Sequence, residues 1–252
     1  MLSKFLRSPR PAPAASFSVV PGERLYAIGD VHGCRDELER LLSLIDADDA
    51  ARGPAATSLI FLGDLVDRGP DSAGVVARLL ELARQRPTTR FLKGNHEEVF
   101  LLALDGDREA LRLFCRVGGR ETLMSYGLSR EDYDALDYDE LAERLPDLVP
   151  ATHRDFLDGF EDLVISGDYA FVHAGIRPEV PIEDQVPADL RWIRGSFLDH
   201  RRPHPKMIVH GHTITDDIDR RANRIGIDTG AYASGKLSAL GLESTDAWTL
   251  QT

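Results

Sequence analysis

The most constraining feature of this chain is a short apolar run that recurs three times in its first hundred residues. Each run is followed by a polar cluster that contains glycine, and then by a helical pattern. Short apolar runs bounded by turn residues indicate buried strands, whereas apolar residues at helical spacing indicate amphipathic helices. Strands are predicted at 24–28, 58–62 and 89–92, and helices at 35–45, at 71–84 and from 97 onward. This β-α-β-α-β order favours an α/β (α+β) core with layered helices.

The remaining chain divides into a helical middle and a strand-rich end. Residues from about 105 to 160 are helical in pattern, acidic, and interrupted by glycine pairs and prolines, which predicts a helical insertion over the core. Short strands are predicted from 163 to 250, and we expect them to form a second sheet facing the first. Residues 1–22 read as a mobile N-terminal tail, and residues 23–252 as one domain.

Composition limits the classes of partner. The net charge of −12 disfavours a broad nucleic-acid-binding face, because an acidic surface repels the phosphate backbone. It does not exclude a phosphate substrate, since bound metal ions reverse the local field. The two cysteines form neither a metal-binding spacing nor a disulfide framework, and no apolar run is long enough to span a membrane. We therefore expect a cytoplasmic protein with no nucleic-acid or membrane partner. The sequence predicts no oligomeric state.

Five polar clusters follow predicted strands. They are Gly29-Asp30-Val31-His32-Gly33, Gly63-Asp64-Leu65-Val66-Asp67-Arg68-Gly69, Gly94-Asn95-His96-Glu97, His173-Ala174-Gly175 and His210-Gly211-His212-Thr213. In open α/β sheets, ligands bind beyond the carboxyl ends of the strands, so all five clusters could form one site. A single Gly-Asp pair is usually a turn or a helix cap, and a single histidine is usually structural. The specificity lies in the set of five.

The clusters are rich in Asp, His and Asn and contain no cysteine ligand. Oxygen and imidazole donors suit Mn, Fe or Zn at an open catalytic site, and they suit a structural zinc site poorly. Two such ions can clamp the attacking and leaving oxygens of a phosphoryl transfer. His210 and His212 are both candidates in the last cluster, and we favour His212 as the ligand. His153, His200 and His204 are interpreted as structural.

On these five clusters the chain resembles the phosphoprotein phosphatase family of metallophosphoesterases, particularly its bacterial serine/threonine phosphatase branch. The resemblance extends from Arg24 to Leu242 and is most specific in the three N-terminal motifs. It implies a calcineurin-like metallophosphoesterase β-sandwich flanked by helices, with two divalent metal ions between the sheets. Mn is the expected metal, with Fe or Zn as alternatives.

The resemblance also implies a role for each motif residue. Asp30 and His32 would hold the first metal, and Asp64 would bridge both. The second metal would be completed by Asn95, His173 and His212. A metal-bridging hydroxide would attack phosphorus directly. His96, oriented by Asp67, would protonate the leaving group. Arg68 would bind phosphate oxygens, and Arg194 is the candidate for a second phosphate-binding arginine.

The reaction expected from this resemblance is hydrolysis of phosphoserine or phosphothreonine in proteins, or of a small phosphoester. The alternative is a symmetrical diadenosine tetraphosphate hydrolase, because both reactions use the same central chemistry. A nucleotide enzyme would need an aromatic platform or a basic pocket, and the acidic insertion has few aromatic residues. A nuclease fits the acidic charge poorly. A non-catalytic binding module predicts the loss of a chemical residue, and none of the motif residues is missing.

Overall fold

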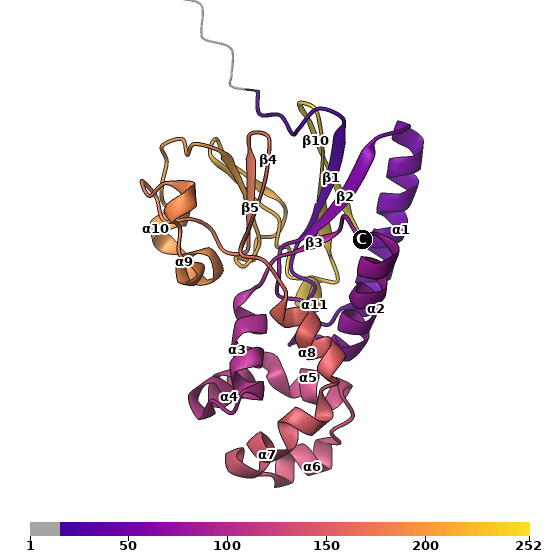
Figure 1. The fold of residues 1–252 in the computed structure, drawn as a ribbon, viewed down its shortest axis with the longest axis vertical. Coiled ribbons are helices and arrows are strands. Elements are labelled where there is room, and N and C mark those ends of the chain that lie inside the picture. The colour runs from indigo at the N-terminus through magenta and orange to yellow at the C-terminus, as the bar shows by residue number, and fades with distance from the viewer. Residues whose placement is uncertain (1–15) are drawn as a thin grey trace, which may run out of the picture.

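The computed structural model describes residues 16–252 and contains two five-stranded sheets that face each other, with helices on the outside (Figure 1). The first sheet has the order β10-β9-β1-β2-β3, and the second has the order β4-β5-β6-β8-β7. The first comprises β1 (Glu23–Ile28), β2 (Ala56–Phe61), β3 (Arg90–Phe91), β9 (Ser238–Glu243) and β10 (Asp246–Gln251). The second comprises β4 (Leu163–Ser166), β5 (Tyr169–Val172), β6 (Met207–His210), β7 (Asp219–Arg220) and β8 (Arg224–Gly226). The expected β-sandwich flanked by helices is confirmed.

Alternation along the strands builds the layers. In β1, Tyr26 and Ile28 pack toward the helices, whereas Leu25 and Ala27 pack between the sheets. Such a period of two is expected for a strand with a core on each face. On the outer face of the first sheet lie α1 (Arg35–Arg52) and α2 (Ser72–Gln85). The helices α9 (Pro187–Trp192) and α10 (Gly195–Leu198) adjoin the outer face of the second sheet.

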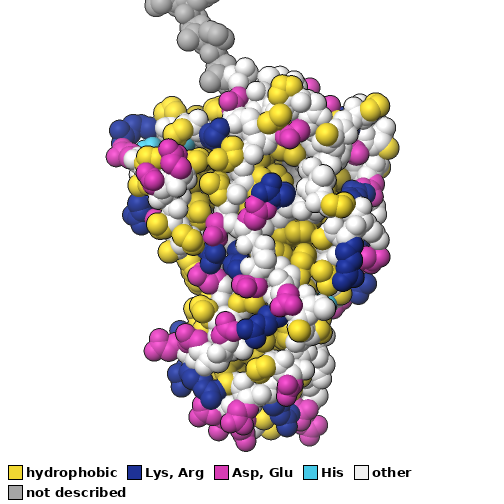
Figure 2. Space-filling view, in the orientation of Figure 1, with side chains coloured by type: hydrophobic (Ala, Val, Ile, Leu, Met, Phe, Trp, Pro, Cys, Tyr) yellow, Lys and Arg dark blue, Asp and Glu magenta, His cyan; other side chains and the backbone are white. Residues whose placement is uncertain are grey.

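The helical insertion forms the lower lobe in Figure 1 and follows α3 (Asn95–Leu104). It contains α4 (Arg108–Phe114), a π-helical turn (Cys115–Gly119), α5 (Arg120–Ser125), α6 (Arg130–Ala135), α7 (Tyr138–Leu148) and α8 (Ala151–Asp158). Two short helices complete the described chain, a 3-10 turn (Ile182–Asp184) and α11 (Ala231–Ser234). Acidic side chains are frequent on the surface of the lower lobe, interspersed with arginines (Figure 2). The insertion is therefore a polar, solvated cover on its outer side.

The end of the chain departs from the prediction. We expected all strands after residue 163 to form the second sheet, but β9 and β10 belong to the first, where β9 pairs antiparallel with β1. The apolar residues of 238–243 predict a buried strand, but they do not indicate which strand it pairs with. The pairing is decided by β1, whose second edge would otherwise be left without hydrogen bonds. The short strand β7 was not predicted.

The chain entering the domain is in contact with both sheets. Of the predicted tail, residues 1–15 lie outside the described residues. Val19 is buried, and its N–H donates to the carbonyl of Ser244 at 3.0 Å. The N–H and hydroxyl of Ser18 both donate to Asp168, at 2.9 and 3.0 Å. Within residues 16–252, no helix has the length and apolar character needed to cross a membrane.

Candidate metal centre

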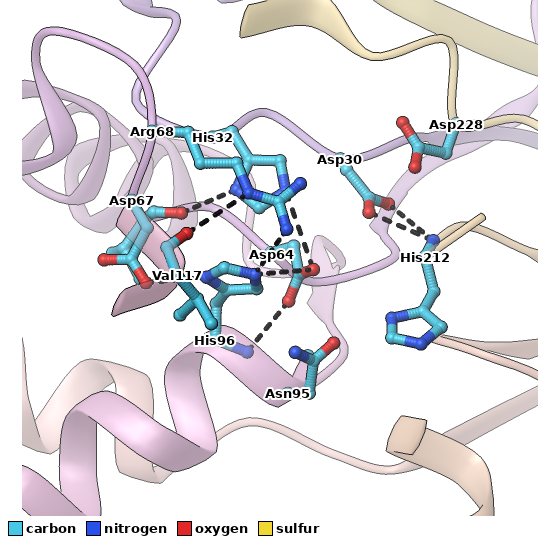
Figure 3. A network of polar contacts seen from close by, with 12 residues as sticks. Asp30, His32, Asp64, Asp67, Arg68, Asn95, His96, Val117, His212 and Asp228 are labelled. Carbon is cyan, nitrogen blue, oxygen red and sulfur yellow. Dashed lines mark hydrogen bonds and ion pairs between the residues drawn. The ribbon is translucent and has the colours of Figure 1, made fainter. Parts of the chain in front are cut away.

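All five polar clusters meet at one edge of the sandwich. Residues from the ends of β1, β2, β5 and β6, and from the start of α3 behind β3, surround one buried point (Figure 3). The side chains brought together are those of Asp30, His32, Asp64, Asp67, Asn95, His96, His173 and His212. The strand ends meet here because β1, β2 and β3 are parallel, as are β5, β6 and β8.

Asp64 lies at the centre of the cluster. Its Oδ2 is 3.6 Å from Nε2 of His32, 3.4 Å from Nε2 of His173 and 3.9 Å from Nε2 of His96. Two groups of possible ligand atoms share this carboxylate: one with His32 and His96, the other with His173 and His212. A carboxylate between two sets of donors has the position required of a bridging ligand.

The histidine rings present lone pairs to the cluster. Nδ1 of His32 is 2.8 Å from the carbonyl of Val66, and Nδ1 of His173 is 2.8 Å from the carbonyl of Leu62. A carbonyl only accepts, so each Nδ1 carries the proton, which orients Nε2 toward the centre as a potential ligand. Nε2 of His32 is buried and has no hydrogen-bond partner within the described residues. A bound cation would satisfy this atom.

A second group of lone pairs converges on His173. Its Nε2 lies 3.0 Å from Oδ1 of Asn95, 3.2 Å from Nδ1 of His212 and 3.4 Å from Oδ2 of Asp64. Electron-pair donors this close repel one another unless a proton or a metal ion lies between them. The three contacts therefore fit a cation held by Asn95, His173, His212 and Asp64.

The charge of the site also fits a cation. Burial, together with the negative charges of Asp228 and Asp64, raises the pKa of Asp30 well above its usual value. Burial opposes ionisation of Asp64 too, but the adjacent imidazoles of His173 and His96 hold its pKa well below the usual range. Buried carboxylates so close together are stabilised as anions by a metal ion.

Asp228 was not identified from the sequence. It is buried, lies beside Asp30 in Figure 3, and accepts a hydrogen bond from the N–H of Gly230 at 2.9 Å. The signal that could have found it is the one used for the other clusters, because Asp228-Thr229-Gly230 closely follows β8. A strand is predicted at 224–227, but the polar residues that follow it were not counted among the five clusters.

Beside the metal donors lies a chain of three side chains. Nδ1 of His96 is 2.6 Å from Oδ2 of Asp67, and Nη2 of Arg68 is 3.0 Å from Nε2 of His96. Burial lowers the pKa of His96, but the carboxylates of Asp64 and Asp67 outweigh this effect and raise it. Asp67 thus orients the imidazole of His96 through Nδ1. Nε2 of His96 faces Arg68, where phosphate oxygens would bind.

The backbone of the site is strained. Seven non-glycine residues within 16–252 have positive φ. Five of them belong to the predicted site, namely His32, Asp64, Asp67, Arg68 and His212, with φ between 45° and 73°. Each such residue costs about 1–3 kcal/mol, and strain of this kind concentrates where function requires a fixed geometry. The strain therefore supports a functional role for these turns.

Two glycines in the clusters are explained by close approach of a ligand residue. A Cβ on Gly211 would lie 2.0 Å from Oδ1 of Asp30, whose carboxylate accepts the N–H of His212 at 3.0 Å. A Cβ on Gly94 would lie 2.2 Å from Oδ1 of Asp64. Only glycine leaves room for these carboxylates.

The structure separates the two histidines of the last cluster. His212 lies among the donors, whereas His210 packs against Phe197 with ring centroids 5.1 Å apart. Nδ1 of His210 contacts the carbonyl of Gly211 at 3.0 Å. His210 therefore has a structural environment.

Arg194 lies at the rim. It is exposed, at the start of α10, and no described residue forms an ion pair with it. The pKa of His212 is lowered to about 2, mainly by burial and His173, and Arg194 contributes to this lowering. Its charge is thus felt at the cluster, and its guanidinium is available to an incoming anion.

An aromatic ring also lies at the rim. Tyr232 of α11 is 39% exposed, its ring centroid is 5.4 Å from that of His32, and the guanidinium carbon of Arg68 lies 4.9 Å from its centroid. From the sequence, only the aromatic residues of the insertion were considered as a platform for a nucleotide base. The structure supplies one from a different element, so the scarcity of aromatics in the insertion does not argue against a nucleotide substrate.

The sequence and the structure were compared with known proteins. The sequence matches the calcineurin-like phosphoesterase family over residues 23–243. It is 37% identical over 162 residues to a protein of Acidovorax sp. (strain JS42) named symmetrical bis(5'-nucleosyl)-tetraphosphatase, a match covering 64% of this chain and 47% of the relative. It is 26% identical to the asymmetrical bis(5'-nucleosyl)-tetraphosphatase PrpE of Anoxybacillus flavithermus (strain DSM 21510 / WK1), covering 84% and 88% of the two chains.

The fold is similar to that of a solved structure described as a candidate diadenosine tetraphosphatase. The TM-score is 0.62, the identity 21%, and the coverage 94% of this chain and 98% of that one. This likeness supports the fold alone. The chain spans about half the length of the first curated relatives that it matches.

These relatives contradict the principal functional prediction. We expected a serine/threonine protein phosphatase, but several relatives at 33–37% identity are named symmetrical bis(5'-nucleosyl)-tetraphosphatases. The prediction was wrong because the five clusters encode metal binding and phosphoryl transfer, which both kinds of enzyme share. Substrate choice depends on side chains outside these clusters.

Proposed function

Because this chain belongs to the calcineurin-like phosphoesterase family, we propose that it is a metal-dependent hydrolase of dinucleoside polyphosphates such as diadenosine tetraphosphate. The observation that carries the chemistry is the buried set of converging donors around Asp64, with an unpartnered Nε2 on His32. The names of the relatives support the substrate class. A phosphoanhydride substrate is compatible with the acidic surface, because its charge would be met locally by metal ions and arginines.

We assign two divalent ions to the site. Asp30 and His32 would hold one, Asn95, His173 and His212 the other, and Asp64 both. Mn is the first metal to test, with Fe and Zn as alternatives, since imidazole and carboxylate donors suit all three. When bound, such ions neutralise phosphate charge and acidify a water molecule so that it can attack phosphorus at neutral pH.

The protein side chains have separate tasks in this scheme. Arg68 would bind phosphate oxygens through its N–H donors, and it lies beside the imidazole, because its Nη2 donates to Nε2 of His96 at 3.0 Å. When a phosphate takes the place of this contact, His96 protonated at Nε2 would donate to the leaving oxygen, while Asp67 accepts from Nδ1. We assign to Arg194, which is exposed at the start of α10, the binding of a more distant phosphate of a long substrate.

Tyr232 supports a nucleotide over a simple phosphate ester. It is a half-exposed ring beside the phosphate-binding Arg68, so a base or ribose could pack against it while a phosphate contacts the arginine. Tyr232→Ala should then raise KM for diadenosine tetraphosphate more than for 4-nitrophenyl phosphate, which has no base or ribose.

The test is product analysis. The protein is stripped with chelator, reloaded with Mn, and incubated with diadenosine tetraphosphate, and the nucleotides are separated by chromatography. We expect metal-dependent cleavage of one phosphoanhydride bond, and two molecules of ADP from each substrate if the cut is symmetrical. ATP plus AMP would indicate asymmetrical cleavage by the same centre. Intact substrate, under conditions in which 4-nitrophenyl phosphate is hydrolysed, would refute the proposed substrate class.

A further inference from the structure

The helical insertion reaches into the site through one threonine. Oγ1 of Thr122, in α5, donates to Oδ1 of Asp67 at 2.7 Å and accepts the N–H of Asp67 at 2.9 Å. The side chain of Thr122 is completely buried. The other carboxylate oxygen of Asp67 contacts His96, so Thr122 fixes the oxygen that His96 does not use.

The hydroxyl of Thr122 is held by a further contact. Oγ of Ser72, at the start of α2, is 2.9 Å from Oγ1 of Thr122 and 3.0 Å from the N–H of Asp67. Since the Thr122 hydrogen is given to the carboxylate, Ser72 can donate its own to Thr122. The carboxylate plane of Asp67 is thus determined by groups on two helices that are distant in the sequence.

The same segment of the insertion touches Arg68. The N–H of Arg68 donates to the carbonyl of Gly118 at 3.0 Å, and its Nε donates to the carbonyl of Val117 at 3.4 Å. Gly118 has φ +121° and interrupts the helix at the π-helical turn. A Cβ there would lie 2.7 Å from Cγ and 2.8 Å from N of Arg68. Only glycine permits this approach.

We propose that Thr122 and Gly118 are positioning residues through which the helical insertion fixes Asp67 and Arg68 for the reaction. Thr122 acts through Asp67 on the orientation of His96, and Gly118 acts on the guanidinium that binds phosphate. The proposal rests on the proposed roles of Asp67, Arg68 and His96. It gives the insertion a task in the chemistry in addition to covering the core. Both target residues have strained backbones, with φ of 73° and 68°, which external hydrogen bonds must maintain.

The first arm of the test compares Thr122→Val with Thr122→Ser. Valine keeps the shape and removes the hydroxyl, whereas serine keeps the hydroxyl. We expect Thr122→Val to lower kcat at least about tenfold with KM changed less than about twofold, and Thr122→Ser to stay within about threefold of wild type. Metal content should be unchanged in both. The matched control is Thr89→Val, since Thr89 is buried and its hydroxyl has no partner in the described chain.

Two results in this arm would overturn the proposal. One is a Thr122→Val enzyme with kcat within about threefold of wild type. The other is a Thr122→Ser enzyme that loses as much as Thr122→Val, because packing of the methyl group would then explain the loss. Thermal melting of each variant shows whether it is folded.

The second arm measures binding of inorganic phosphate to the Mn-loaded protein by calorimetry. We expect Gly118→Ala to weaken phosphate binding at least about fivefold, because the new Cβ displaces Arg68. Gly127→Ala is the matched control. Gly127 has φ +98° in the same insertion, but no atom lies within 4 Å of its added Cβ. Equal phosphate affinity of the two variants would overturn the proposal, and this arm decides the question if Thr122→Val does not fold.

Failure of this proposal can be distinguished from failure of the proposed function. All kinetic comparisons are made with 4-nitrophenyl phosphate in parallel with diadenosine tetraphosphate. A wild-type protein that cleaves only the former would refute the dinucleoside polyphosphate assignment and leave the Thr122 comparison valid. The phosphate titration requires no turnover.

Discussion

Glu97→Gln is the substitution whose effect follows most directly from the structure. Glu97 is completely buried in the first turn of α3, and backbone N–H groups surround its carboxylate. Oε1 accepts from Leu65 at 2.7 Å and from Val66 at 3.3 Å, while Oε2 accepts from Asp64 at 2.8 Å and from Gly94 at 2.9 Å. Glu97 therefore holds together the two turns that carry Asp64 and Asn95.

The expected magnitude comes from counting donors. Glutamine has one oxygen and one NH₂ group, so whichever way its amide is turned, two buried backbone N–H groups face another donor. Leaving one buried donor unsatisfied costs about 1–3 kcal/mol, so we expect a loss of about 2–6 kcal/mol in the free energy of unfolding. Typical domains have about 5–15 kcal/mol in total, so the change should be large and could prevent folding at 37 °C.

The assay is urea unfolding of chelator-treated protein, because bound metal would add its own stabilisation. The control is Glu98→Gln, the next residue of the same helix, whose carboxylate is partly exposed and pairs with Arg191 at 3.2 Å. This pair is partly exposed, and glutamine can still accept the hydrogen bond that Trp192 donates to Glu98 at 2.6 Å, so we expect a loss of about 1 kcal/mol. If the two variants lose the same free energy, the reasoning about the buried carboxylate is wrong.

Four further predictions concern the site and the acid sensitivity of the fold. Asp64→Asn should abolish both metal binding and activity; metal analysis checks it, and turnover by the metal-free variant would refute the dinuclear scheme. His96→Asn should lower kcat at least about 100-fold with metals still bound, and loss of metal instead would make His96 a ligand. Arg194→Ala should raise KM for diadenosine tetraphosphate by about tenfold with little change in metal content, and an unchanged KM would remove it from the site. Asp48 is partly buried, which opposes its ionisation, but hydrogen bonds outweigh this and hold its pKa below the usual value. The donors are Arg52, Tyr26 and Trp248. Since the folded pKa is depressed, the stabilisation from Asp48 is present at neutral pH and is lost as pH falls below about 4. Asp48→Asn should therefore unfold more easily in urea at pH 7 and lose less stability on acidification, and parallel acid titrations of the two proteins would contradict this.

The sequence by itself determined which residues make up the candidate site. Glycine-bounded clusters of Asp, His and Asn after predicted strands led to a common edge of the sandwich, and Asp30, His32, Asp64, Asn95, His173 and His212 do converge there. This was possible because the information is local: strand, turn and donor residue are contiguous in the chain, and parallel strands end at the same edge.

The contacts that support the proposed site and substrate class were decided by tertiary structure. Tyr232 lies beside Arg68, and Thr122 beside Asp67, only because α11 and α5 fold back onto turns more than 50 residues away. The pairing of β9 with β1 in the first sheet depends on tertiary packing in the same way. A linear pattern records which residues can be buried or can bind a metal. It does not record which segment packs against them, because that depends on the summed burial and hydrogen bonding of the whole chain.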